Sequence, residues 1–327
     1  MQLKIEILKI LEANPETDIS GQLLAEKFGV SRNAIWKAVR SLQAEGYRIC
    51  AGQNRGYRLS AENDMLSAVA IADAIQHRTR GMAIYVRRTV DSTNDEAKRL
   101  LTEGKTGPAL IVSEEQTAGR GRQGKTFYSP KQAGIYMTLS FPSALPLYAA
   151  VSVTTASAVA VFLAIRDLTG TETEIKWVND LYLHGKKICG ILTEAISDFE
   201  SGRAQHIMIG IGINIWTEEF PDGLRETAGA LYPKGVTRNQ LVARIVDRLL
   251  EVTANLGDES YLDLYRRHSM VLGREVVYVR DGETYTGRAV DIDEDGGLIV
   301  EDAEGERTVL NSGEITLRPV LSETSPV

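Results

Sequence analysis

The sequence predicts an α+β protein built from three domains, and three observations support this. At 327 residues the chain is longer than one average domain. Residues 1–63 show apolar spacing typical of helices, and residues 64–269 alternate β-like and helical stretches. Residues 270–320 contain short β-like runs between Gly or acidic turns. We therefore expect a helical first domain, a central α/β domain with a mixed sheet, a small antiparallel β-barrel, and a loose tail at 321–327.

The first domain has the pattern of a winged helix-turn-helix. One helix is expected over 21–28 and a second over 32–45, with Ser31 as its N-cap and Gly46 as its end. YRIC and GYRL, on either side of AGQNR, predict the two strands of a wing. A further helix is expected in LKIEILKILEA, because its apolar residues recur at helical spacing.

The second helix of this pair has an apolar face and a polar face. Ile35, Ala38, Val39 and Leu42 follow the i, i+3, i+4, i+7 spacing and are expected to pack inward. Residues 1–60 hold nine Lys or Arg against six Asp or Glu, so they carry +3 in a chain of net charge −7. A basic helix face suits the phosphates and base edges of DNA, and we predict contacts from Arg32, Asn33, Trp36, Lys37, Arg40 and, on the wing, Arg55.

The central part predicts strands at 83–89, 109–116, 134–141, 173–178, 186–195 and 205–215, and helices at 94–103, 147–168, 237–256 and 258–268. Thr93 followed by Glu96 predicts a capping box for the first of these helices. The uncharged segment 147–165 approaches membrane-spanning length. Its Ser and Thr residues and the two preceding prolines favour a helix buried against the sheet instead. Residues 60–65 are expected to be a polar connector.

Other classes of protein receive no support from the sequence. The two cysteines, Cys50 and Cys189, cannot form a disulfide framework, and no C-x-x-C or His cluster predicts zinc. The N-terminus lacks a basic stretch followed by an apolar core, so no signal peptide is predicted. The cytoplasm is the expected compartment.

The stretch GRGRQGKT, residues 119–126, fits two phosphate-binding patterns at once: the G-x-G-x-x-G of dinucleotide sites and the G-x-x-x-x-G-K-[ST] of P-loops. Both patterns need a helix directly after the loop, but Pro130 and Gly134 interrupt the following segment. We therefore reject both. Three close cations, Arg120, Arg122 and Lys125, repel one another unless an anion lies among them. The loop is expected to close over a phosphate-bearing or acyl-phosphate ligand, the alternative being a solvated basic hairpin.

Four motifs, taken in order, carry a resemblance. DSTN, EEQTAGRGRQGK, KWVNDLYLHGKKICGILTE and IGIGIN resemble those of the biotin–protein ligases. With the winged helix, the chain resembles the bifunctional bacterial ligases that also repress biotin genes. The family implies a class II synthetase-like central domain and an SH3-like C-terminal barrel. Val178 stands where the family usually has proline, and Lys125 and Phe127 stand where the loop often has arginine and tryptophan.

The resemblance also implies a two-step reaction. Biotin and ATP, with Mg²⁺, give biotinyl-5′-AMP, and biotin then passes to a lysine of a biotin carboxyl carrier domain, such as that of acetyl-CoA carboxylase. The adenylate-bound homodimer represses transcription at operator DNA. By family match the catalytic residues are Lys187 and Arg122. Biotin is bound by Ser92, Thr93, Asn94, Gln116, Arg120, Gly121, Arg122, Lys187 and Gly190, and the nucleotide by Arg122, Lys176, Asn179 and Asn214.

Three alternatives remain open. The chain could be a repressor that senses biotin or its adenylate without transferring it, although the cations around Lys187 argue for α-phosphate chemistry. It could be a lipoate-type ligase, which shares the central fold, although the R-G-R loop and winged helix favour biotin. A P-loop ATPase regulator lacks the helix that its motif requires.

Overall fold

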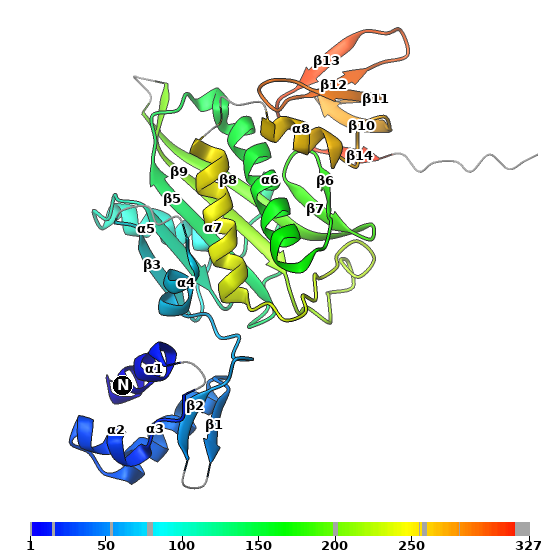
Figure 1. Ribbon diagram of the computed structural model, residues 1–327. Helices are drawn as coiled ribbons and strands as arrows, with labels where there is room; N and C mark the ends of the chain where they lie inside the picture. Colours follow the sequence, from blue (N-terminus) through cyan, green and yellow to red (C-terminus); the bar gives the residue numbers. More distant parts are fainter. Residues whose placement is uncertain are drawn as a thin grey trace, which may run out of the picture.

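The N-terminal lobe is a winged helix with its own core. The computed structural model describes residues 2–14, 17–52, 55–76, 81–198, 202–254, 256, 260–280 and 282–317. Helices α1 (Gln2–Ala13), α2 (Gly21–Phe28) and α3 (Arg32–Ala44) precede a hairpin of β1 (Ile49–Gly52) and β2 (Gly56–Leu59) (Figure 1). The Ser31 hydroxyl accepts the N–H of Ala34, and Gly29 ends α2 with φ 63°. The predicted helix-turn-helix and wing are confirmed; wing residues 53 and 54 lie outside the described residues.

The central domain contains a seven-stranded mixed sheet in the order β3-β4-β5-β9-β8-β7-β6. Strands β3 (Ala83–Arg87) and β4 (Ala109–Ser113) are parallel, and the other neighbours are antiparallel. The remaining strands are β5 (Gly134–Pro142), β6 (Glu174–Lys176), β7 (Asp180–Leu183), β8 (Lys186–Asp198) and β9 (Arg203–Asn214). Six strands confirm the prediction. The seventh, β7, was not predicted, because four residues with a bulge give no readable alternation.

Helices cover the two faces of this sheet unequally. Alternate residues of a strand point to opposite faces, so Leu110 and Val112 of β4 pack with α6 (Ala150–Thr169) and α7 (Arg238–Ala254), whereas Ile111 packs with α5 (Thr93–Thr102). In Figure 1, α6 and α7 cross the face turned to the viewer. Segment Leu147–Thr169 is apolar enough to cross a membrane, but 78% of its most apolar window is buried inside the protein. The predicted buried helix is confirmed.

Smaller elements join the domains. Helix α4 (Ala68–Ala74), which was not predicted, follows the connector, and α8 (Ser260–Arg267) precedes the C-terminal sheet. That sheet is antiparallel in the order β13-β12-β11-β10-β14, as predicted. Its strands are β10 (Glu275–Arg280), β11 (Glu283–Ile292), β12 (Leu298–Glu301), β13 (Arg307–Leu310) and β14 (Ile315–Leu317). The Ser152 hydroxyl and the Trp177 indole donate to the carbonyls of Asp295 and Gly296, which ties this domain to α6 and β6. The tail at 321–327 lies outside the described residues.

One local prediction is wrong. The N-cap of α5 is Ser92, which makes no side-chain cap hydrogen bond, so Thr93 and Glu96 do not form a capping box. The N–H of Thr93 donates instead to Gln116 Oε1, and Glu96 accepts from Arg87 and Arg99. Gln116 and Arg87 from outside α5, together with Arg99 one turn later, have taken the place of the capping-box contacts.

Candidate active site and DNA-facing helix

A cleft lies on the sheet face opposite α6 and α7. It measures about 310 Å³, enough for a small-molecule ligand. Its walls come from the 92–94 segment, the 119–127 loop, and strands β6 to β9. Residues 224–228 and 313–315 complete it. Four stretches that are separate in sequence therefore meet here, and two segments that the sequence did not single out join them.

The floor of the cleft is a network of polar side chains that are hydrogen-bonded to one another. The N–H and hydroxyl of Thr93 donate to Gln116 Oε1 at 2.9 and 3.2 Å, and Gln116 Nε2 donates to Ser129 Oγ at 2.9 Å. The buried Thr138 hydroxyl lies 2.6 Å from Asn94 Oδ1 and 2.8 Å from Thr93 Oγ1. Ser92, Thr93 and Asn94 are themselves buried. These groups are held in fixed directions, which suits a neutral ligand with several donors and acceptors.

Glycines on β8 and β9 leave this face of the sheet without side chains, which makes room for the cleft. Gly190 pairs with Gly212 across the two strands. A Cβ on Gly212 would lie 2.5 Å from the Phe127 ring, and one on Gly210 would lie 2.4 Å from Asn94 Oδ1. Side chains at these positions would therefore displace residues of the cleft. Phe127, which the sequence analysis left without a role, packs over Gly190 and Gly212; its aromatic side chain three residues after a glycine loop was the available signal.

Cations gather at the other end of the cleft. Lys187 Nζ lies 2.7 Å from Asp180 Oδ1. Burial lowers the pKa of Lys176; the charges of Asp180 and Glu314 oppose that effect, and those of Lys187 and Lys125 add to it. Burial also lowers the pKa of the Arg122 guanidinium, against the opposing charges of Asp180 and Glu314. Lys176, Lys187 and Arg122 are half-buried. A half-buried group of positive charges stabilises a bound anion.

The three cations of the glycine loop take separate partners. Arg120 pairs with Asp95 and Glu194, and Lys125 pairs with Glu314 of the C-terminal domain. Protein carboxylates therefore balance the charges of Arg120 and Lys125. The expectation that a bound anion is needed among the three cations is wrong for these two residues. Within the described part of the chain, Arg122 makes one hydrogen bond, 3.5 Å long, to Asn179. Arg122 alone among them is therefore placed to receive a ligand anion.

The rejection of both phosphate-loop patterns is confirmed. After β4 the described chain forms a one-turn 3₁₀ helix, η1 (Arg122–Gly124), and then β5, so no α-helix directly follows the loop as both patterns require. The loop is a hairpin: Gly121 N–H donates to Lys125 O at 2.7 Å, and Phe127 N–H to Gly119 O at 2.9 Å.

Most of the predicted site residues line this cleft, but Asn214 does not. Asn179 lies there and donates to Ile191 O at 2.7 Å. Asn214 ends β9, where it is buried and donates to Gly229 O at 2.9 Å. Its Oδ1 has no hydrogen-bond partner among the described residues. The Gly229 segment pairs with Lys187 and brings Thr227 and Ala228 into the cleft wall, so Asn214 supports the wall from behind.

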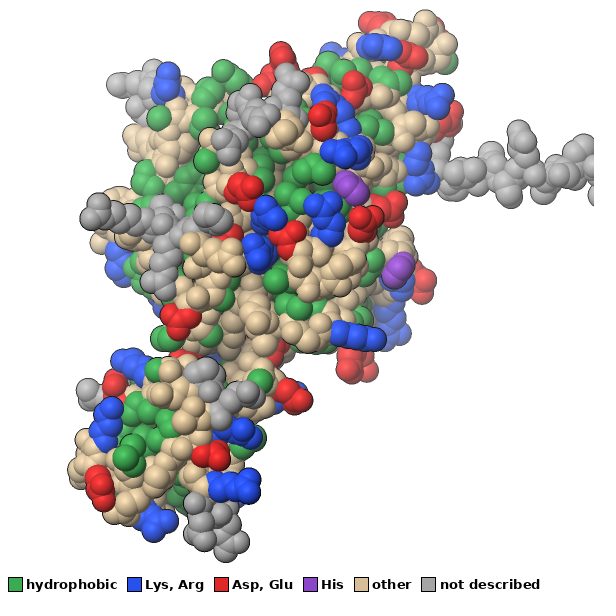
Figure 2. Space-filling view, in the orientation of Figure 1, with side chains coloured by type: hydrophobic (Ala, Val, Ile, Leu, Met, Phe, Trp, Pro, Cys, Tyr) green, Lys and Arg blue, Asp and Glu red, His purple; other side chains and the backbone are tan. Residues whose placement is uncertain are grey.

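The predicted DNA-contacting face is exposed. On α3, Ile35, Val39 and Leu42 are buried, whereas the polar positions face solvent, and Trp36 is 48% exposed with Arg40 stacked on its ring. Arg55 is exposed beside the wing tip. Figure 2 shows several Lys and Arg side chains on this lobe, which a narrow neck joins to the rest of the molecule. The inward and outward faces of α3 are as predicted.

Comparisons with known proteins agree with this arrangement. The sequence pattern of the Biotin/lipoate A/B protein ligase family matches residues 85–214, that of an HTH domain matches 4–58, and that of the Biotin protein ligase C terminal domain matches 271–318. A Bifunctional ligase/repressor BirA from Bacillus spizizenii is 30% identical over 95% of this chain and 97% of its own length. The chain belongs to the biotin protein ligase family.

Other members of the biotin protein ligase family are similar over shorter spans. The Bifunctional ligase/repressor BirA of Escherichia coli is 30% identical over 91% of this chain and 92% of its own. Among solved structures, the biotin protein ligase from Aquifex aeolicus in complex with biotin and ATP superposes with a TM-score of 0.61. It is 26% identical and covers 72% of this chain and 98% of its own.

Proposed function

We propose that this chain is an ATP-dependent biotin–protein ligase that also represses transcription. The observation that carries the proposal is a single cleft in which a fixed polar floor adjoins a group of half-buried cations. The floor suits the neutral ureido ring of biotin, through Ser92, Thr93, Asn94 and Gln116. The cations suit a carboxylate and a nucleotide phosphate. Family membership and the ligand-bound Aquifex aeolicus structure support this choice of ligands.

The first step joins two anions. The biotin carboxylate attacks the α-phosphate of ATP, and the bond between the α- and β-phosphates breaks. Pyrophosphate leaves, and biotinyl-5′-AMP stays bound. Charge neutralisation and positioning therefore dominate the barrier. Lys187, oriented by Asp180, and Arg122 supply the positive charge, with Lys176 and Asn179 on the nucleotide side. Gly121 and Arg120 complete the loop over biotin, Gly190 leaves space for its bicycle, and Asn214 supports the nucleotide wall.

The second step needs no nucleophile from this chain. A carrier lysine amine attacks the activated carbonyl, an amide forms, and AMP leaves while the amine proton passes to solvent. Mg²⁺ would enter with ATP, where phosphate oxygens, water and a protein carboxylate are the ligands it prefers, and it would help to neutralise the phosphate charge. Asp180 lines the cleft beside these cations, and its carboxylate oxygen is the donor type that magnesium prefers.

Repression follows from the attached winged helix. The exposed face of α3 and Arg55 would contact operator DNA. Loop ordering around the adenylate would favour a homodimer, which places two winged helices on a palindromic site in the cytoplasm. Leu147, Tyr148 and Ile196 are large apolar side chains exposed on the central domain, which supports association. Equal dimer affinity with and without biotinyl-AMP would exclude the coupling.

The domain boundaries form part of this proposal: 1–63 for DNA, 64–269 for catalysis, and 270–320 for the C-terminal domain. The buried contacts of Asp64, Met65 and Leu66 with the central domain support the first boundary.

One mixture tests the proposed activity. The purified chain is incubated with ATP, Mg²⁺, labelled biotin and a biotin carboxyl carrier domain. Covalent label on the carrier supports the ligase. Label bound to the protein without transfer would favour the sensing repressor, and transfer of labelled lipoate instead of biotin would favour the lipoate-type ligase. Omitting ATP is the control.

A further inference from the structure

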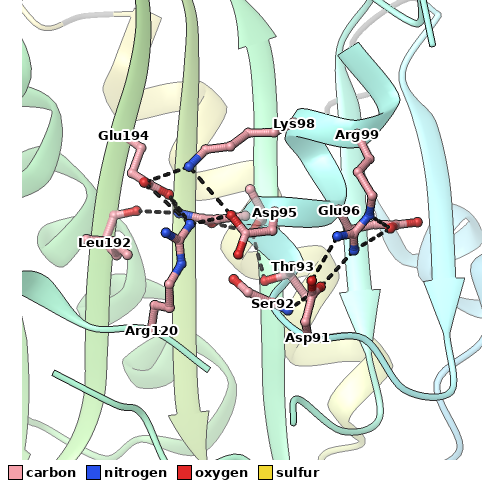
Figure 3. A network of polar contacts seen from close by, with 12 residues as sticks. Asp91, Ser92, Thr93, Asp95, Glu96, Lys98, Arg99, Arg120, Leu192 and Glu194 are labelled. Atoms are coloured by element: carbon pink, nitrogen blue, oxygen red, sulfur yellow. Dashed lines mark hydrogen bonds and ion pairs between the residues drawn. The ribbon is translucent and has the colours of Figure 1, made fainter. Parts of the chain in front are cut away.

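A compact ionic network lies beside the cleft, between the glycine loop, α5 and β8 (Figure 3). Arg120 Nη2 lies 2.6 Å from Asp95 Oδ1 and 3.1 Å from Glu194 Oε2. Lys98 Nζ lies 2.9 Å from Glu194 Oε1 and 3.6 Å from Asp95 Oδ1. Two cations thus alternate with two anions. Figure 3 shows the Arg120 side chain pointing toward Glu194 on β8 and Asp95 in the first turn of α5.

Glu194 links this network to the polar floor. Its Oε2 accepts a hydrogen bond from Asn94 Nδ2 at 2.7 Å, and Asn94 Oδ1 lies against the Thr138 hydroxyl. Burial raises the pKa of Glu194, but hydrogen bonds from Lys98 and Asn94 and the charge of Arg120 outweigh it, so the pKa lies below its ordinary value. Glu194 is therefore ionised while it holds both the floor and the loop.

The loop itself makes the position of Arg120 decisive. The backbones of Arg120 and Thr126 form an antiparallel β-bridge across the 119–127 hairpin. A backbone hydrogen bond from Gly121 N–H to Lys125 O also joins its two strands. Glycines on both sides of Arg120 leave this strand of the hairpin without other side-chain ties. The tip at 122–124 projects Arg122 toward Asn179. Arg120 therefore holds one strand of the hairpin while the Lys125–Glu314 pair holds the other, and together they set where Arg122 is presented.

We propose that Asp95 and Glu194 are positioning residues for the ligase reaction, acting through Arg120. They hold the Arg120 guanidinium away from the reacting atoms, so that the hairpin presents Arg122 to the carboxylate and α-phosphate and stays closed over the adenylate. The inference rests on the proposed ligase function. It assigns Arg120 an anchoring role in place of the direct biotin contact that the family resemblance implies.

The test uses full-length variants and two readouts of loop closure. Labelled biotinyl-AMP is formed in the protein, and its release is followed after a chase; labelling of bystander lysines on an added inert protein is measured in parallel. The side chains of Arg120 and Asp95 are 39% and 32% exposed, so their pair is partly screened. Asp95→Asn is therefore expected to speed release by about fivefold, to increase bystander labelling, and to change the melting temperature little.

Glu96→Gln is the matched control. Glu96 follows Asp95 in α5 but accepts from Arg87 and Arg99 at 2.8 and 2.9 Å, on the side away from the loop (Figure 3). The Glu96→Gln substitution removes one carboxylate charge from the same helix, as Asp95→Asn does, but leaves the contacts of Arg120 intact. The rate of adenylate release is therefore expected to stay at the wild-type value. Asp95→Glu, which restores the charge, is expected to recover most of the retention. Wild-type release from Asp95→Asn would overturn the proposal.

A double variant separates anchoring from direct contact. If Arg120 acts through Asp95 and Glu194, Arg120→Met and Asp95→Asn weaken the same tie, and the double variant releases adenylate no faster than Arg120→Met alone. Additive effects would overturn the proposal, because Arg120 would then act on the ligand independently. A wild-type protein that forms no adenylate would instead refute the proposed function, so the two failures are distinguishable.

Discussion

Arg238→Met is expected to destabilise the central domain strongly, because Arg238 clamps the connector from a buried position. Its side chain is 2% exposed at the start of α7. Nε and Nη1 lie 2.9 and 2.8 Å from carboxylate oxygens of Asp64 and Glu114. Nη2 and Nη1 also donate to the carbonyls of Asp64 and Gly134. The polar connector that the sequence predicts is therefore held by buried ionic contacts.

The magnitude follows from what the substitution leaves behind. Glu114 is buried. Without Arg238 its carboxylate loses its ion-pair partner and keeps the hydrogen bond that it accepts from the Leu66 N–H at 2.8 Å. Removing one partner of a buried ion pair costs about 3 to 5 kcal/mol, a large part of the roughly 5 to 15 kcal/mol that stabilises a typical domain. Glu114→Gln alone is expected to cost about 1 to 3 kcal/mol, because Asp64 still pairs with Arg238.

Urea unfolding followed by tryptophan fluorescence measures these changes. Trp216 donates its indole N–H to Asp64 at 3.0 Å, so it reports on the clamp directly. The double variant Arg238→Met/Glu114→Gln is expected to lose less than the two single losses added together, by about 0.5 to 3 kcal/mol, because no buried charge remains on Glu114. A loss below about 1 kcal/mol for Arg238→Met, or strict additivity, would refute this reasoning.

Three further predictions concern the cleft. Lys187→Met should fold yet form adenylate about 100- to 1,000-fold more slowly, because the developing charge on the phosphate loses a cation; pyrophosphate release measures this, and a near wild-type rate would remove Lys187 from the mechanism. Since burial lowers the pKa of Lys176, the KM for ATP should rise with increasing pH as Lys176 loses its proton, at a pH below the ordinary lysine pKa of about 10.4. Lys176→Arg should flatten that rise, and equal profiles would count against it. Gly210→Ala should raise the KM for biotin about tenfold, because the new Cβ would lie 2.4 Å from Asn94 Oδ1; Gly107→Ala, whose Cβ meets nothing within 4 Å, is its control.

Local pattern was sufficient for the elements whose cause is local. Ser31 caps α3 as predicted, and the helix predicted over 21–28 ends at Gly29, because both residues act on neighbouring backbone groups. Except for β7, the strands of the central and C-terminal sheets were readable from their apolar runs. The capping box of Thr93 and Glu96 failed because Gln116 and Arg87, both outside the helix, bond to these residues instead.

For the site, too, some features follow from the sequence and others only from the tertiary structure. The sequence by itself determined which chemical groups are available: a cationic glycine loop, Lys187 near the start of a strand, the polar DSTN stretch, and glycines that keep a sheet face low. Only the tertiary structure decided how the cations are used. Arg120 finds Glu194 at a separation of 74 residues and Lys125 finds Glu314 at 189, while Arg122 keeps one long hydrogen bond to Asn179. The partner of a charge depends on distance in space, and sequence spacing does not specify that distance once the chain has folded.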